Sequence, residues 1–157
     1  MEEKGREPLE AFNRLYKQMD ECYHAYARSQ GLSDAAFWLL YCLNESGPCT
    51  QRELCAAWSY PPQTINSALK SLVAKGVLAL SSLPGDRKSK RIALTPKGRQ
   101  LLNSSIAPLV AAERRAFLAL NGEERQALLA LTGRYAARLQ AEVAACIKQA
   151  APPSAQT

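Results

Sequence analysis

Four basic residues stand close together near the middle of the chain, directly after a turn-forming stretch. Arg87, Lys88, Lys90 and Arg91 form the densest basic cluster of the sequence. Cationic side chains at this density attract a polyanion such as the phosphate backbone of a nucleic acid. Asp86 precedes the cluster, and we predict that it is structural and shapes the turn by pairing with a nearby arginine.

The preceding segment, residues 61–74, is predicted to be a helix with two chemically different faces. An apolar stripe repeats at i, i+3, i+4, i+7 and i+8 through Ile65, Ala68, Leu69, Leu72 and Val73. The opposite face is polar and nearly free of carboxylates, whereas a solvated helix surface usually mixes Glu with Lys. Amide and hydroxyl groups on a helix can read base edges in a major groove. We assign this role to Gln63, Thr64, Asn66, Ser67 and Lys70.

Elements on both sides of this helix are predicted to position it. The T-x-x-E pattern from Thr50 to Glu53 is a capping box that opens a preceding helix after a short strand. Two helices joined by a short turn form a helix-turn-helix pattern. Residues 77–82 and 91–94 have strand composition and flank a Pro-Gly-Asp turn, which predicts a β-hairpin with a basic tip.

Two further groups of residues are predicted to contact DNA. At the start of the preceding helix, Thr50, Gln51 and Arg52 are predicted to contact the DNA backbone and so to position the protein. On the hairpin, Arg87, Lys88 and Lys90 are predicted to reach the minor groove or its phosphates. Arg91 is expected to pack or to contact phosphate.

Longer helices are predicted before and after this region. Residues 8–30 carry a heptad-like apolar seam, which either packs on the chain's own core or meets a partner subunit. Ser33 caps a second, deeply buried helix, and a long helix begins at Thr95-Pro96 and is kinked or split at Pro108. Asn121 and Glu124 are predicted to form a capping box at the start of a last helix. The expected fold is mainly α with a small β-hairpin wing. We expect a winged helix-turn-helix region over 33–95 and helical dimerisation regions over 1–32 and 96–150. Residues 151–157 are expected to form a disordered tail.

The charge distribution supports a nucleic-acid partner and excludes several other classes. Residues 51–99 hold nine basic and two acidic residues, whereas the rest of the chain holds 11 basic and 12 acidic ones. The longest fully apolar run, residues 35–43, is far shorter than the roughly 20 residues of a membrane-spanning helix. The five cysteines contain no C-x-x-C motif, so we expect reduced thiols, a cytoplasmic location and no metal or cofactor. No paired-carboxylate, nucleophile–base or phosphate-loop motif is visible, so the chain is not expected to be an enzyme.

The order of these elements resembles the MarR family of bacterial transcription regulators, over roughly residues 9–148. The resemblance rests on Gly31-Leu32-Ser33, on QTINSALKSLVAKGVL (63–78) and on GDRKSKRIALTPKG (85–98), whose fixed spacing is the most specific signal. It implies a homodimeric winged-helix protein that binds a palindromic site in double-stranded DNA, with the dimer formed by the first and the last two helices. The family usually has arginine where Lys88 stands, so Arg87 is the alternative for a minor-groove contact.

The resemblance also implies regulation, since many members are repressors released by small aromatic ligands or by cysteine oxidation. The residues that could wall an effector pocket, with a structural core as the alternative, are Tyr16, Met19, Tyr23, His24, Trp38 and Tyr41. Cys22 is the candidate for thiol-based sensing, although a small buried side chain is the default for each cysteine. A winged helix used for protein interaction is a further alternative, but such modules tend to lose the wing charge that this chain keeps.

Overall fold

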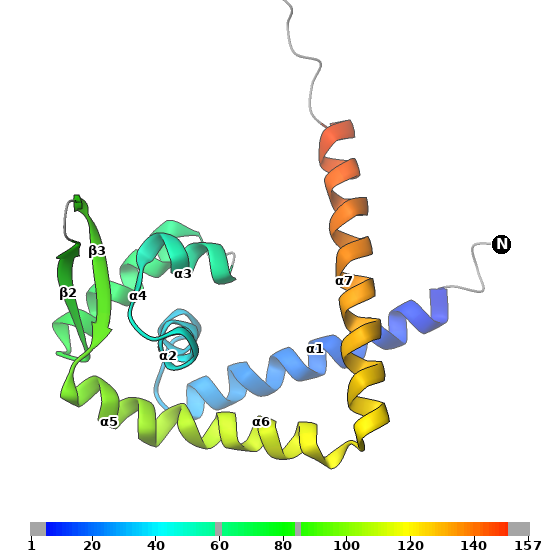
Figure 1. Cartoon of the computed structure of the whole chain (residues 1–157), viewed down its shortest axis with the longest axis horizontal. Helices are drawn as coiled ribbons and strands as arrows, with labels where there is room; N and C mark the ends of the chain where they lie inside the picture. Colours follow the sequence, from blue (N-terminus) through cyan, green and yellow to red (C-terminus); the bar gives the residue numbers. More distant parts are fainter. Residues whose placement is uncertain (1–5, 59–60, 84–85, 151–157) are drawn as a thin grey trace, which may run out of the picture. The chain divides into compact units, whose positions relative to one another are not determined.

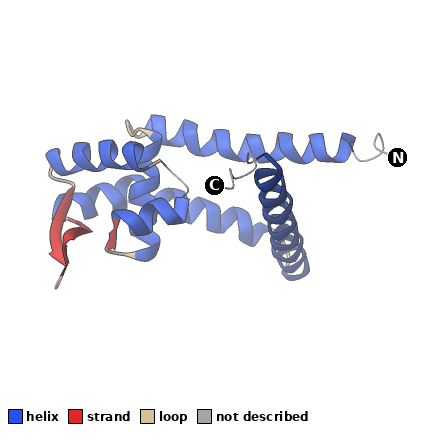
Figure 2. Cartoon of the chain, turned by 90° about the horizontal axis from the view of Figure 1, so that it is seen from above, coloured by secondary structure: helices blue, strands red, loops and turns tan. Residues whose placement is uncertain are grey.

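The computed structural model describes residues 6–58, 61–83 and 86–150, and the side chains of residues 6, 57–58, 83 and 86–89 lie outside the description. Helices α1 (Arg6–Ser29), α2 (Asp34–Ser46), α3 (Gln51–Trp58) and α4 (Pro62–Ala74) lead to strands β2 (Leu78–Leu83) and β3 (Asp86–Leu94). A short strand β1 (Cys49–Thr50) lies between α2 and α3, and helices α5 (Pro96–Ser105), α6 (Ala107–Ala119) and α7 (Gly122–Ala150) follow (Figures 1 and 2). The predicted fold class, a mainly helical chain with a β-hairpin wing, is confirmed.

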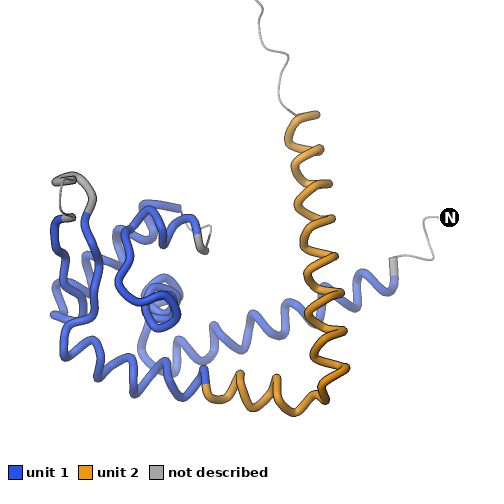
Figure 3. The backbone as a smooth tube through the Cα atoms, in the orientation of Figure 1, with its two compact units in different colours: residues 1–110 blue, residues 111–157 orange. Residues whose placement is uncertain are grey.

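Two compact units divide the chain at residue 110 (Figure 3). The first unit holds the elements from α1 to α5 and the start of α6, and the second holds the rest of α6 and α7. None of the described helices combines the length and the apolar character that a membrane-spanning segment needs.

The core of the first unit is formed mainly by α2 and α4. α2 buries Phe37, Leu39 and Leu40 almost completely, as its nearly continuous apolar sequence predicts. α4 buries Ile65, Ala68, Leu69 and Leu72, with Val73 partly buried against the same cluster, so the predicted apolar stripe is confirmed. Burial of each large aliphatic side chain stabilises the fold by about 1.5–3 kcal/mol, and this burial fixes which face of α4 points outward.

The sheet has the order β1-β3-β2 and is antiparallel throughout. β3 is longer than predicted, because its pairing with β2 continues from Leu94 to Lys90 and resumes, after a register shift, at Asp86, beyond the predicted strand over 91–94. The backbone of the basic cluster therefore belongs to a strand rather than to a loop at the wing tip. The reason is that ladder hydrogen bonds are made by the backbone, so a basic run paired with β2 can extend a strand without an alternating apolar pattern.

Local side-chain caps mark the helix ends where the sequence predicts them. The Ser33 hydroxyl accepts a hydrogen bond from the Ala36 N–H at 3.3 Å at the start of α2. Asn121 and Glu124 exchange reciprocal hydrogen bonds of 3.0 and 2.7 Å at the start of α7. The predicted long helix is split at Ile106, two residues before Pro108, because proline removes a hydrogen-bond donor and crowds the preceding turn.

A tight junction joins the end of α4 to the start of α5, and so holds both ends of the wing. The Thr95 hydroxyl donates to the Gly76 carbonyl at 2.7 Å and accepts from the Gly98 N–H at 3.0 Å. The Thr95 N–H donates to the Val77 carbonyl at 3.1 Å. Gly98 is buried, and a Cβ placed on it would overlap the Val77 carbonyl oxygen, so only glycine lets the two backbones approach this closely.

We predict that Gly98→Ala destabilises the protein by about 1–3 kcal/mol, because the added methyl group must displace backbone rather than a flexible side chain. Gly133→Ala in α7 is the matched control, since among the described residues nothing lies within 4 Å of the place that its new methyl group would take. This control should be neutral or stabilising by up to about 1 kcal/mol. Urea denaturation of both variants measures the difference. Equal stability of the two variants would show that the junction tolerates a side chain.

Candidate nucleic-acid interface

The start of α3 is fixed by the predicted capping box. The Glu53 N–H donates to the Thr50 hydroxyl oxygen at 3.3 Å, and the Glu53 carboxylate accepts from the Thr50 N–H at 2.7 Å and from its hydroxyl at 2.9 Å. Hydrogen bonds from the Thr50 backbone and then from its side chain lower the pKa of Glu53. The carboxylate is therefore engaged locally, and Arg52 beside it remains exposed.

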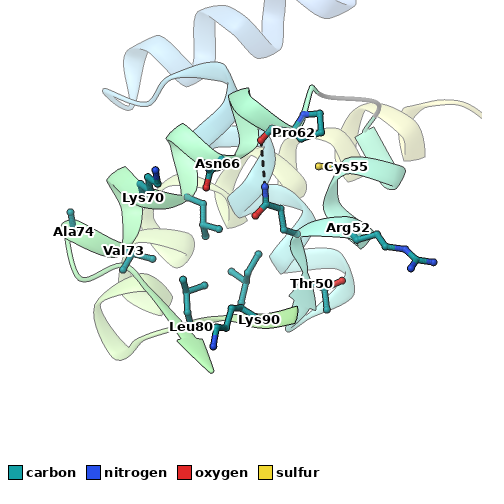
Figure 4. A pocket seen from close by; sticks show the side chains of 13 residues that line it. Thr50, Arg52, Cys55, Pro62, Asn66, Lys70, Val73, Ala74, Leu80 and Lys90 are labelled. Atoms are coloured by element: carbon teal, nitrogen blue, oxygen red, sulfur yellow. Dashed lines mark hydrogen bonds between the residues drawn. The ribbon is translucent and has the colours of Figure 1, made fainter. Parts of the chain in front are cut away.

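A side-chain hydrogen bond links α3 to the first turn of α4. The Gln51 amide donates to the Pro62 carbonyl at 3.4 Å, shown by the dashed line in Figure 4. Gln51 is predicted to position the DNA backbone, and this hydrogen bond gives the amide a structural partner across the helix-turn-helix. Pro62 stands in the first turn of α4, where its missing N–H leaves no intrahelical hydrogen bond unmade.

The outward face of α4 carries the residues predicted to read bases. Burial of the apolar stripe leaves Gln63, Thr64, Ser67 and Lys70 exposed, with Asn66 half-buried at the edge of the face. α4 has no acidic residue in its first turn, so nothing there would repel a phosphate. These five side chains lie on one helix face, as the geometry of a groove-reading helix requires.

The wing adds a positively charged side chain beside this face. The Lys90 ammonium on β3 donates to the Ser82 hydroxyl at 2.8 Å, across the register pair that these two residues form. Lys90 is exposed, and Arg91, which faces Ser81 and Thr50 in the sheet register, is exposed as well. The side chains of Asp86, Arg87 and Lys88 lie outside the described residues, so their predicted roles stay predictions.

A cavity of about 810 Å³ opens between α3, α4 and the wing (Figure 4). Its lining combines the predicted residues Thr50, Gln51, Arg52, Asn66, Lys70 and Lys90 with others that sequence reasoning did not select, namely Cys55, Pro62, Leu69, Val73, Ala74, Leu80 and Ile92. Leu80 is 44% exposed although Leu78 on the same strand face is buried. Side chains alternate between the two faces of a strand, so Leu78, Leu80 and Ser82 lie on one face. This alternation could have placed Leu80 at the cavity, whereas the composition of the strand could not.

The residues predicted to wall an effector pocket fall into two groups. The rings of Tyr23, Trp38 and Tyr41 form a chain of aromatic contacts, with centroid distances of 5.2 Å from Tyr23 to Trp38 and 5.5 Å from Trp38 to Tyr41. All three pack against the core, and Tyr16 and Met19 are exposed on α1. Cys22, the predicted redox residue, is exposed on the same helix.

His24 bridges α1 and α2. Its Nε2 lies 3.1 Å from an Asp20 oxygen and its Nδ1 lies 2.8 Å from an Asp34 oxygen. The hydrogen bond to Asp34 is the largest cause that raises the pKa of His24, and the negative charges of Asp34 and Asp20 add to it. Among the described residues, no group of three histidine, cysteine or acidic side chains is placed to hold a metal ion.

Comparison with known proteins agrees with this geometry. A model of the MarR family matches residues 30–89, which run from the end of α1 into the wing. The HTH-type transcriptional repressor NicR of Pseudomonas putida is 30% identical over 118 residues, which cover 68% of this chain and 75% of the relative. The match therefore extends beyond the helix-turn-helix to most of both chains.

Two solved structures illustrate the shared fold. BpsR of Bordetella bronchiseptica, whose DNA binding is described as regulated by 6-hydroxynicotinic acid, is 25% identical with a TM-score of 0.61, covering 80% of this chain and 98% of BpsR. NMB1585 of Neisseria meningitidis, a MarR family regulator, is 21% identical with a TM-score of 0.71, covering 87% of this chain and 96% of NMB1585. The winged-helix architecture is therefore common to all three chains.

We predict that His24 stabilises the fold at mildly acidic pH. A histidine with a raised folded-state pKa contributes stability fully below its unfolded pKa of about 6.5, and this contribution is lost as pH rises through the folded pKa. The imidazole side chain is 32% exposed, so the contribution should stay below about 1 kcal/mol. Urea denaturation of the wild type and His24→Gln between pH 5.5 and 8.5 should show a gap that narrows with rising pH. A gap independent of pH would contradict the charge-based origin.

Proposed function

We propose that this chain, which belongs to the MarR family of transcription regulators, acts as a homodimeric repressor that binds a palindromic DNA site and is released by a small aromatic ligand. The observation that carries the proposal is the two-sided character of α4. Its apolar stripe is buried, and its carboxylate-free polar face is exposed beside the cations of the wing and of α3.

The proposed DNA contacts are of two kinds: contacts with the backbone position the protein, and contacts with base edges read the sequence. Thr50, Gln51 and Arg52 at the start of α3, with Arg87, Lys88 and Lys90 on the wing, contact phosphates or the minor groove and set the register. Gln63, Thr64, Asn66, Ser67 and Lys70 on α4 contact base edges in the major groove. The family and its fold are those of DNA-binding regulators, which are not enzymes.

The proposed dimer is supported by apolar side chains that a single chain leaves exposed. On α1 these are Leu9, Phe12, Leu15, Tyr16 and Met19, and on α7 they are Leu128, Leu129, Leu131, Tyr135, Leu139, Val143 and Ile147. Apolar stripes of this length on soluble helices usually mark an interface. A two-fold dimer would place two α4 helices about 34–36 Å apart, so we propose a palindromic site. In this arrangement, residues 1–32 and 96–150 are the dimerisation regions and 33–95 the DNA-binding region.

The effector is proposed from the aromatic cluster and from the relatives. Tyr23, Trp38 and Tyr41 offer ring faces, Tyr16 and Met19 offer apolar surface, and His24 offers a positive charge when protonated. BpsR responds to a hydroxylated aromatic acid, which fits this chemistry. The alternative is release by oxidation of Cys22, which is exposed on α1.

Selection from a random duplex pool tests the DNA-binding function. The full-length protein should enrich a palindrome whose half-sites are centred about one helical turn apart. On that duplex, Asn66→Ala should cost about 1–3 kcal/mol at particular base pairs. Lys90→Ala should instead weaken binding to all sequences and lower the salt slope by about one.

Lys17→Ala is the matched control for loss of one positive charge, because Lys17 is exposed on α1 and lies 3.7 Å from Glu21. It should change neither the affinity nor the salt slope beyond the small effect of net charge. Absence of sequence-selective enrichment at ~150 mM salt would refute the proposed function, since specific binding normally persists there.

Titration of the protein–DNA complex with 6-hydroxynicotinic acid and related hydroxybenzoic acids tests the effector. We expect release of the duplex, with His24→Gln raising the ligand concentration at half release several-fold. The DNA affinity of the same variant without ligand is measured as the reference. The redox alternative predicts that hydrogen peroxide releases the duplex and that Cys22→Ser abolishes this release. Unchanged binding with every aromatic acid would contradict the aromatic effector.

A further inference from the structure

The C-terminal end of α4 is held by side chains from the start of α5. The Lys97 ammonium donates to the Lys75 carbonyl at 2.8 Å, and the Thr95 hydroxyl donates to the Gly76 carbonyl at 2.7 Å. Lys97 is exposed and stands 22 residues after Lys75, so its hydrogen bond joins two elements that are far apart in the sequence. Figure 1 shows the end of α4, the base of the wing and the start of α5 at one corner of the first unit.

Backbone hydrogen bonds close the last turn of α4 and leave the Lys75 carbonyl to another donor. The Val77 N–H donates to the Leu72 carbonyl and the Gly76 N–H donates to the Val73 carbonyl, both at 2.9 Å. Gly76 has a φ of 69°, so these two bonds form a Schellman motif, which satisfies the two carbonyls. The carbonyl of Lys75, the C-cap residue, lies beyond this motif and takes its donor from α5.

The position of Lys97 is electrostatically better for α4 than for its own helix. Lys97 lies in the first turn of α5, where the partial positive charge of a helix N-terminus disfavours a cation. α4 has no basic residue in its last turn, and a cation is favourable at that end of a helix. The ammonium group is therefore unfavourable for α5 and favourable for α4, which indicates that its role is to hold the end of α4.

Directional hydrogen bonds fix what burial of the apolar stripe of α4 leaves open. The packing of Ile65, Leu69 and Leu72 fixes the rotation of the helix, but apolar contacts are non-directional and tolerate a small displacement along the helix axis. A hydrogen bond is lost when its donor and acceptor move apart by about 0.5 Å. The hydrogen bonds of Lys97 and Thr95 therefore hold α4 against displacement along its axis and against tilt.

We propose that Lys97 is a positioning residue that sets the axial position of α4 in the major groove, and with it base discrimination, without contacting DNA itself. The inference rests on the proposed function, in which side chains of α4 contact base edges. Such hydrogen bonds need donor–acceptor distances of about 2.7–3.2 Å, so a displaced α4 would lose discrimination at the bases that Asn66 contacts. A phosphate contact by Lys97 would instead strengthen binding to every sequence alike.

Lys97→Met in the full-length protein tests this role, because methionine keeps an unbranched side chain and lacks the donor. Lys75→Met is the matched control: it removes one positive charge at the same corner, whereas the Lys75 carbonyl that accepts the hydrogen bond belongs to the backbone and stays. Affinity is measured on the selected duplex and on a duplex substituted at a base pair where Asn66→Ala reduces discrimination. The ratio of the two dissociation constants is independent of the folded fraction, so a loss of stability alone would not change it.

Lys97→Met should lower this ratio at least about threefold and leave the salt slope unchanged, whereas Lys75→Met should keep the ratio of the wild type. In the Asn66→Ala background, Lys97→Met should change the ratio by less than about twofold, because both substitutions act through the same base contact.

An unchanged ratio in Lys97→Met would overturn the inference, and a salt slope lower by about one would then identify a phosphate contact. An equal fall of the ratio in Lys75→Met would trace the effect to charge and would also overturn it, as would full additivity with Asn66→Ala. A wild type that discriminates between no base pairs would count against the proposed function itself, which the wild-type ratio measures separately.

Discussion

Burial of one stripe of α4 is the constraint on which the DNA-binding face depends. Ile65, Leu69 and Leu72 can leave water only by packing against α2 and the sheet, and this burial fixes the rotation of α4 about its own axis. The polar side chains at the remaining positions then lie on the opposite side of the helix, away from the core. Because α4 is packed by one face, its other face, which carries the side chains proposed to contact bases, points outward as a direct consequence.

The base of the wing is held by contacts that Thr95 and Gly98 make with the backbone at the end of α4. Thr95 bonds the Gly76 carbonyl and Gly98 meets the Val77 carbonyl without a Cβ between them. These contacts join the end of α4 to the start of α5, so both strands of the hairpin leave from one fixed corner.

The sequence was most informative where one residue type has one local role. The Thr50–Glu53 and Asn121–Glu124 capping boxes, the helix break before Pro108 and the stripe of α4 were all predictable from spacing. The length of β3 was not, because pairing depends on the backbone of β2 and not on the basic side chains.

α1 combines two environments in a single helix, and this links the proposed dimer to the DNA-binding face. Tyr23, Tyr26 and Ala27 at its C-terminal end pack into the core of the first unit, whereas Leu9 and Tyr16 toward its N-terminal end are exposed. A straight helix transmits position along its length, so a partner bound to the exposed half would be held in fixed relation to that core. In the proposed dimer, the spacing of the two α4 helices would then depend on how α1 packs on α2. The bridge from His24 to Asp20 and Asp34 and the ring contact of Tyr23 with Trp38 lie at that packing, so a ligand bound there would act on half-site spacing without touching α4.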